Sequence, residues 1–368
     1  MSVEVPSPFR ASDRWLHRYA ILVVICTLGL IALGGLVTSR EAGMAVPDWP
    51  TTYGYNMFFF PIRLWQGGIF DEHVHRLAAS GVGLLTVILA VWVQWVERRG
   101  WVKKLGWGAL ALVVFQGVLG GKRVVLNSVP VFGVPGSIFF GVFHAATAQI
   151  FLCLLGTLAL ATSRFWRTSV SGSVTAAGKW VPILTGLILL QLLVAATMRH
   201  QHAGLAIPDF PLAHGRWYPP TDSDFVSALN QRRSEVLAYS PITAFQIHLQ
   251  MVHRFLAVLI LVGVWSQALT STKVGGPMAR WAWLWSSLLL VQFALGIITV
   301  LTDKAADMAT AHVVVGAASL LTGVLFSLVV WRLKWGRVED ISCRRPLEFL
   351  NPLPVAPESS GATWRPAR

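Results

Sequence analysis

AGMAVPDWP, from Ala42 to Pro50, recurs further along the chain as AGLAIPDFP, from Ala203 to Pro211. The positions that differ exchange Met for Leu, Val for Ile and Trp for Phe, so the two stretches keep the same size and polarity. A Pro-Asp turn that arose by chance would not bring its neighbours with it. The recurrence therefore indicates an internal duplication of the chain.

The duplication continues downstream of both stretches. EHVHR at Glu72 to Arg76 recurs as QMVHR at Gln250 to Arg254. Two polar residues inside apolar runs recur as well: Gln116 as Gln292, and His144 as His312. The repeated unit is therefore long enough to hold several secondary-structure elements.

The composition places these repeats in a membrane. Of the 368 residues, 54% are hydrophobic and 13% are charged, and the mean hydropathy is +0.59. A helix needs about 20 apolar residues to cross the hydrocarbon core, and lipid forces each backbone polar group to pair within its own segment. We therefore expect an all-α polytopic membrane protein with eight transmembrane helices, arranged as two pseudo-symmetric four-helix bundles. The apolar runs lie at 17–39, 74–96, 105–121, 137–162, 180–198, 245–270, 281–301 and 308–331.

Four helices per half is an even number, so the two halves share one orientation, as in a parallel repeat about the membrane normal. The longer loop at 199–244 is expected to form an external cap. We expect the chain to divide into five parts. The two membrane halves are an N-terminal half at 17–162 and a C-terminal half at 180–334. The other parts are a cytoplasmic N-terminus at 1–16, a cytoplasmic linker at 163–179 and a disordered cytoplasmic tail at 335–368.

The distribution of positive charge predicts the orientation. Of the 30 Lys and Arg, 19 fall on the side of the two termini and 11 on the other side. This bias predicts a multi-pass protein of a bacterial-type inner membrane with both termini in the cytoplasm. The net charge of +13 then reflects topology and contact with anionic lipid, and nucleic acid is not an expected partner because no soluble basic domain remains.

Four histidines carry the strongest functional signal. His75, His144, His253 and His312 each lie one to two turns inside the external end of an even-numbered span. Ionisable side chains inside a membrane are costly, and facing imidazoles in a bundle can hold heme iron from both sides. The alternative for any one of them is a core histidine bonded to a backbone carbonyl. A zinc site is less favoured, because soft or carboxylate ligands at tetrahedral spacing are missing.

The residues beside the histidines suggest further roles. Arg76 and Arg254 directly follow their histidines, where a guanidinium can pair with heme propionates or simply reach the membrane interface. Glu72 stands three residues before one histidine, whereas Gln250 stands at the corresponding place in the other half. A carboxylate at the edge of a heme pocket can move protons and an amide cannot. We therefore assign chemistry to the N-terminal half, the alternative being a carboxylate that only pairs with Arg76.

Five segments together resemble the heme A synthase family. They are GGLVTSREAGMAVPDWPTTYG (Gly34 to Gly54), EHVHR, FHAATAQ (Phe143 to Gln149), MVHR (Met251 to Arg254) and DMATAH (Asp307 to His312). The resemblance implies an enzyme, an oxidoreductase that converts the C8 methyl group of heme O to the formyl group of heme A by successive hydroxylation, for cytochrome oxidase assembly. Some members have a cysteine pair in the first external loop, and this chain has none there.

The resemblance also implies roles for individual residues. His75 and His144 match the histidines that face the substrate heme, with heme A as product, and Glu72 matches the catalytic carboxylate. His253 and His312 match the ligands of a heme b cofactor. The implied partners are heme O synthase, an unidentified electron acceptor and the lipid bilayer, and a homo-oligomer is left open.

Two other classes of protein remain open from the sequence. A diheme b-type cytochrome would carry electrons without modifying heme, but it would not need Glu72 to differ from Gln250. A transporter with a histidine proton relay would not need histidines paired at one depth. The pigment in the purified protein separates the three classes.

Overall fold

The computed structural model describes residues 11–168, 176–235 and 241–343, and these are mostly helical. The helices are α1 (Ala11–Ser39), α2 (Gly67–Val96), α3 (Gly100–Val125), α4 (Gly136–Thr162), α5 (Arg164–Thr168), α6 (Val181–His200), α7 (Ser223–Ser234), α8 (Ala244–Thr272), α9 (Gly276–Leu301) and α10 (Ala306–Cys343). Short 3-10 turns are η1 (Met57–Phe59), η2 (Ile62–Leu64), η3 (Ala176–Trp180) and η4 (Ala203–Leu205). A small antiparallel hairpin, β1 (Pro130–Val131) with β2 (Val134–Pro135), joins α3 to α4.

Eight helices in the described part of the chain are long and apolar enough to cross a membrane. They are all the helices except α5 and α7. This confirms the predicted all-α membrane fold with eight spans. The polar residues at the helix starts made the apolar runs shorter than the helices: α2 begins at Gly67, ahead of the predicted start at 74.

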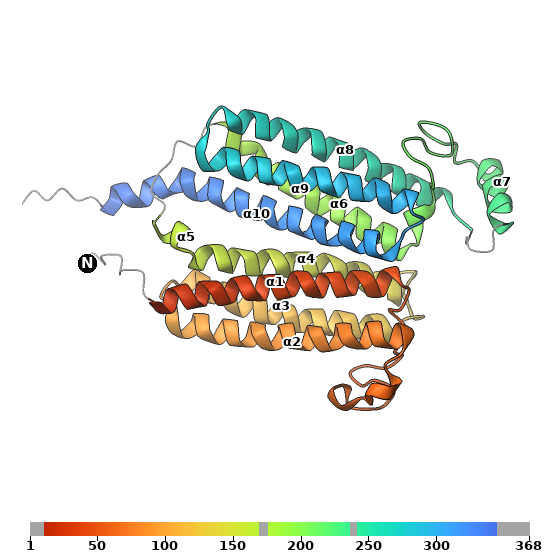
Figure 1. Ribbon diagram of the computed structural model, residues 1–368, viewed down its shortest axis with the longest axis horizontal. Helices are drawn as coiled ribbons and strands as arrows, with labels where there is room; N and C mark the ends of the chain where they lie inside the picture. Colours follow the sequence, from red (N-terminus) through yellow and green to blue (C-terminus); the bar gives the residue numbers. More distant parts are fainter. Residues whose placement is uncertain (1–10, 169–175, 236–240, 344–368) are drawn as a thin grey trace, which may run out of the picture.

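Figure 1 shows the eight long helices in two groups, α1 to α4 on one side and α6, α8, α9 and α10 on the other. Within the first group, α2 packs on α1 and α3, and α4 packs on the same two helices. Helices α8 and α10 are likewise both in contact with α6 and α9. Because α2 faces α4 diagonally, and α8 faces α10, side chains from either pair can meet inside a bundle.

Each group has its own apolar core, and α4 and α10 join the two. The first core includes Val82 and Phe151, and the second includes Trp285 and Phe326. Lipid is as apolar as these side chains, so close packing rather than water exclusion holds such helices together. At Gly156 of α4 an added Cβ would collide with Leu321 of α10, which shows how closely the two groups approach.

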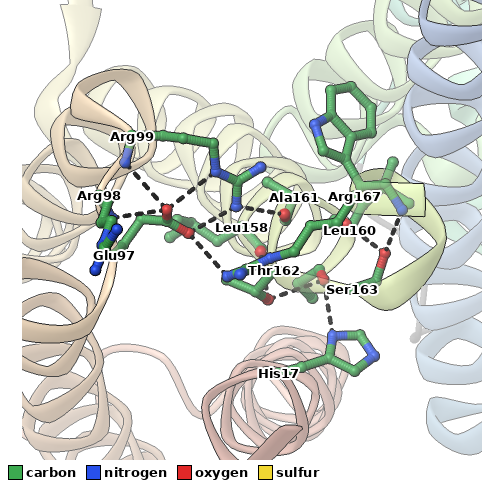
Figure 2. A network of polar contacts seen from close by, with 12 residues as sticks. His17, Glu97, Arg98, Arg99, Leu158, Leu160, Ala161, Thr162, Ser163 and Arg167 are labelled. Carbon is green, nitrogen blue, oxygen red and sulfur yellow. Dashed lines mark hydrogen bonds and ion pairs between the residues drawn. The ribbon is translucent and has the colours of Figure 1, made fainter. Parts of the chain in front are cut away.

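A polar network ties the helices together at the end where α1 begins and α10 ends (Figure 2). The buried Glu97 accepts hydrogen bonds from the side chains of Arg99 and Arg167 at 2.6 and 3.2 Å. Burial alone would raise the pKa of Glu97, but the hydrogen bonds from Arg99 and the charge of Arg167 hold it below its usual value. His17 of α1 is bonded to the carbonyl of Ala159 at 2.9 Å, so α1 is fastened to α4 at this end.

The opposite end, here called the loop end, holds the two repeated stretches. Residues 40–66 connect α1 to α2 without a long helix, whereas the segment after α6 contains α7. Asp222 caps the start of α7, and its side chain accepts a hydrogen bond from the Phe225 N–H. Val226 of α7 packs on a cluster of buried apolar residues that includes Ile207 and Met251. The predicted cap at 199–244 thus contains a helix. At the other end of the molecule α10 continues to Cys343, into the segment expected to be an unstructured tail, and residues 344–368 lie outside the described part.

Candidate functional site

The four histidines come from the two diagonal helix pairs. His75 lies on α2 and His144 on α4, each about two turns after the start of its helix. His253 on α8 and His312 on α10 face each other, with ring centroids 6.4 Å apart. All four side chains are only half-buried, so part of each ring faces space that protein atoms do not fill.

Small residues flank three of the imidazoles. A Cβ added to Gly34 of α1 would lie 3.0 Å from Cε1 of His75. A Cβ added to Gly120 of α3 would lie 3.4 Å from Cε1 of His144, and one added to Gly296 of α9 would lie 3.0 Å from Cε1 of His312. A larger side chain at any of these positions would have to displace the ring. The neighbouring helices therefore fix where the imidazoles can lie.

The imidazole nitrogens are free to bind iron to different degrees. In the described residues, Nδ1 of His75, His144 and His253 is buried without a hydrogen-bond partner. Nδ1 of His312 lies 3.0 Å from the carbonyl of Gln292. A carbonyl can only accept, so this Nδ1 carries the proton and Nε2 of the neutral ring keeps its lone pair, the arrangement usual in metal-binding histidines. The four side chains fit a heme-ligating role.

Glutamines contact three of these histidines, two at the backbone and one at the ring. Gln116 donates to the carbonyl of His144 at 3.1 Å, and Gln191 donates to the carbonyl of His253 at 3.0 Å. The amide of Gln292 lies 3.4 Å from Nε2 of His312. Gln191 was missed by the sequence analysis. Gln191 could have been found in the sequence, because it is a polar residue inside an apolar run, as Gln116 and Gln292 are.

Glu72 is buried and holds the first loop. Its Oε2 accepts the backbone N–H of Val46 at 2.9 Å, and its Oε1 accepts a hydrogen bond from Arg76 at 2.7 Å. The carboxylate and the guanidinium are thus a buried ion pair one turn apart on α2. The pairing with Arg76 that the sequence left as an alternative is present in the structure, and it keeps a negative charge one turn from His75.

Gln250 makes the corresponding contacts in the second half. Its Oε1 accepts the backbone N–H of Ile207 at 2.7 Å. Its amide nitrogen donates to the carbonyls of Gly204 and Ile207 at 3.2 and 3.0 Å. Val46 and Ile207 are corresponding residues of the two repeated stretches. The same loop N–H is therefore bound by a carboxylate in one half and by an amide in the other.

Arg76 and Arg254 bind the loops rather than project away from them. Arg76 donates to the carbonyls of Asp48 and Val46 at 2.7 and 3.1 Å. Arg254 donates to the carbonyls of Asp209 and Leu212 at 2.7 and 2.9 Å. These contacts give both arginines a structural task that the sequence did not reveal. Their predicted pairing with heme propionates stays a prediction.

The two repeated stretches fold into the same turn. Asp48 accepts the backbone N–H groups of Tyr53 and Gly54 at 2.7 and 2.8 Å. Asp209 accepts those of His214 and Gly215 at 2.7 and 2.8 Å. Burial alone would raise the pKa of each aspartate, but these backbone hydrogen bonds hold both pKa values below the usual range. Both turns are consequently built around an ionised carboxylate.

His73 of α2, which contacts the first loop, is a further residue that the sequence did not single out. It is fully buried, its Nδ1 lies 3.3 Å from the hydroxyl of Thr52, and its ring packs against Phe60 and Trp65 at 5.0 and 4.7 Å. The second half has Met251 at the corresponding position. His73 was overlooked because its neighbour His75 carries the repeat, and its contacts indicate a role in holding the loop.

The fold and the site together define a multi-pass membrane protein with one inward-facing histidine pair in each of two helix groups. A comparison with protein families is in agreement. The family model described as cytochrome oxidase assembly protein matches residues 17–325. The chain belongs to this family.

Curated relatives are similar over almost the whole chain. The heme A synthase of Alkalihalophilus pseudofirmus is 26% identical over 323 residues, covering 84% of this chain and 93% of the relative. The heme A synthase of Shewanella oneidensis is 25% identical, covering 86% and 96%. The heme A synthase of Bacillus cereus is also 25% identical, covering 88% and 94%. The similarity therefore extends over both halves.

Proposed function

We propose that this protein is a heme A synthase, a membrane oxidoreductase that converts the C8 methyl group of heme O to the formyl group of heme A for cytochrome oxidase assembly. Membership of the family and the curated relatives support the activity. The observation that carries the proposal is the histidine pair in each half, in which Nδ1 of His75, His144 and His253 is buried and lacks a protein partner among the described residues. Such imidazoles suit the iron of a substrate heme and of a resident heme.

The N-terminal half is the proposed reaction site, with substrate heme O between His75 and His144. Conversion of a methyl group and one water molecule to a formyl group releases four electrons and four protons, through successive hydroxylation of one carbon. Glu72 lies one turn from His75 and is held in place by hydrogen bonds from Arg76 and the Val46 N–H. It is the proposed group that accepts protons or stabilises developing positive charge. An electron acceptor must take up the electrons.

The C-terminal half is the proposed site of heme b. His253 and His312 would hold its iron, since they face each other from α8 and α10. A heme with two histidine ligands supplies electron transfer. Gln250 cannot take up a proton, and it holds the loop through hydrogen bonds alone. This half therefore carries electrons or stabilises the fold, and does not oxidise substrate.

The protein is proposed to lie in a bacterial-type inner membrane with both termini in the cytoplasm, which places the loop end outside. Heme O synthase is the proposed source of the substrate, and the electron acceptor is a further partner. Arg254 remains a proposed partner of the heme b propionates, next to its contacts with the loop.

Pigment analysis of cells given heme O tests the activity. Membranes that contain the protein should accumulate heme A on chromatography, and membranes with the Glu72→Gln variant should not. Purified protein that contains only unmodified heme b would identify a cytochrome, and colourless protein would favour a carrier. Either result would overturn the proposed function.

A further inference from the structure

Arg123 stands at the loop end of the first helix group, in the last turn of α3. Its guanidinium lies against the first repeated stretch, since a Cβ added to Gly43 would be 3.0 Å from one terminal nitrogen and 3.4 Å from the other. It is within electrostatic range of His75, His144 and Glu72. The guanidinium therefore lies against the first loop, at the end of the bundle that holds the histidine pair of the proposed reaction site.

Arg123 has no anionic partner in the part of the chain that the structure describes. It forms no ion pair there, and its buried Nε has no acceptor. Arg76 in contrast donates to three loop carbonyls and to Glu72. The carboxylate in range of Arg123 is Glu72, and both of its oxygens are already bonded. The guanidinium is half-buried and its donors make no hydrogen bond within the described residues, so this position is suited to an anion from outside the chain.

A second cation adds to the positive field. Arg199 of α6 is within electrostatic range of Arg123, and it binds the carbonyl of Gly35 and the hydroxyl of Ser39 at 2.5 and 2.6 Å. Two guanidinium groups within electrostatic range repel each other, and an anion bound near them lowers this repulsion. The second half differs, because the position that corresponds to Arg123 is Thr299, and the nearest cation to its loop glycine is the chain of Lys304.

We propose that Arg123 binds a propionate carboxylate of the substrate heme. This inference rests on the proposed function, in which heme O lies between His75 and His144. A guanidinium offers a planar pair of donors that matches a carboxylate, and Arg123 has donors free for it. The pairing fixes the rotation of the macrocycle about the iron–histidine axis.

The position of the reacting methyl group follows from this rotation. In heme O the C8 methyl group is attached next to a carbon that bears a propionate. A propionate held by Arg123 keeps this edge of the macrocycle at the loop end. Glu72 lies at that end, one turn beyond His75 and within range of Arg123. Arg123 is thus a positioning residue that brings the propionate edge of the macrocycle, which carries the C8 methyl, toward Glu72.

A comparison of two ligands tests the proposal on the full-length purified protein. Heme O and its dimethyl ester differ only in the charge of the propionates. Both are titrated into the wild type and into the Arg123→Gln, Arg123→Lys and Lys122→Gln variants, and the change in heme absorbance gives each Kd. Lys122 is the exposed neighbour of Arg123 on the same helical turn and serves as the matched control.

We expect Arg123→Gln to raise the Kd of heme O by about 10- to 100-fold, the range for a lost hydrogen bond to a charged group. The Kd of the dimethyl ester should change by less than about threefold, because the ester has no charge to lose. The Kd of heme O for Arg123→Lys should lie between those of the wild type and Arg123→Gln, since lysine keeps the charge but lacks the planar pair of donors. Lys122→Gln should match the wild type with both ligands.

Three results would overturn the proposal. Arg123→Gln could bind heme O as tightly as the wild type, or it could lose both ligands equally, which would mean a structural role or a site for a lipid phosphate. Wild-type protein that binds neither ligand would overturn this proposal and the proposed function together. Wild type that discriminates the ligands through Arg123 but yields no heme A would overturn the proposed function alone.

Discussion

The two halves close their loops with the same bond and with different chemistry. Glu72 and Gln250 both lie three residues before a histidine, and both accept a loop N–H, from Val46 at 2.9 Å and from Ile207 at 2.7 Å. The amide of Gln250 also donates to two loop carbonyls. A carboxylate cannot donate a hydrogen bond. In the first half Arg76 therefore donates instead, both to Glu72 and to the loop carbonyls of Asp48 and Val46.

This difference separates what the loop needs from what the reaction needs. In the second half the amide of Gln250 bonds the loop N–H and two loop carbonyls, and it places no charge beside the histidines. A buried carboxylate contributes little stability beyond an amide, because its desolvation offsets much of the attraction to Arg76. The negative charge of Glu72 is therefore best explained by chemistry beside His75.

The largest expected effect comes from removing a ligand in one half. His253→Ala or His312→Ala should abolish the low-spin heme b spectrum, since one imidazole cannot hold iron from both sides. Heme O should still bind at His75 and His144. Absorbance spectra of the purified variants measure the first effect and heme O titration the second. His248→Ala, an exposed position on the same helix, is the control, and an unchanged heme b spectrum in either ligand variant would refute the assignment.

The next effect comes from making the first half like the second. Glu72→Gln should keep the bond to the Val46 N–H, as Gln250 does with Ile207, and leave bound heme largely intact. Formation of heme A should fall by about 100-fold or more, the usual contribution of a general base. Chromatography of extracted pigments measures the product. Glu41→Gln, an exposed residue of the same loop, should retain activity, and full activity in Glu72→Gln would remove the asymmetry between the halves.

Much of the fold could be predicted from the sequence, and less of the site. The apolar runs predict the eight spans because lipid permits little else, and the repeated stretches predict the two sets of histidines. The bond from Val46 to Glu72 depends on a loop conformation that no local pattern encodes. Arg123 was not singled out for another reason: arginines are common at span ends, and only the structure shows this one against the first loop.

The reverse exchange should affect stability and not activity. Gln250→Glu keeps an acceptor for the Ile207 N–H but places a charge against the carbonyls of Gly204 and Ile207, which it can no longer bond. We expect a loss of about 1–3 kcal/mol of stability, the cost of unsatisfied buried groups. Thermal unfolding followed by tryptophan fluorescence measures it, with the exposed Gln231→Glu on α7 as control. A variant as stable as the wild type would mean that Arg254 can take over the part that Arg76 plays in the first half.

The smallest expected effect should be equal in both halves. Asp48→Asn and Asp209→Asn each weaken two backbone hydrogen bonds in the same turn, and each should cost about 1–2 kcal/mol. Both pKa values are lowered in the folded protein. The stabilisation is thus complete above the unfolded pKa of about 3.9 and is lost as the pH falls through the folded value. Thermal unfolding at pH 7 and below pH 4 should show the difference between variants and wild type shrinking in acid. A much larger effect in one half would mean that the two turns, alike in geometry, do not share one role.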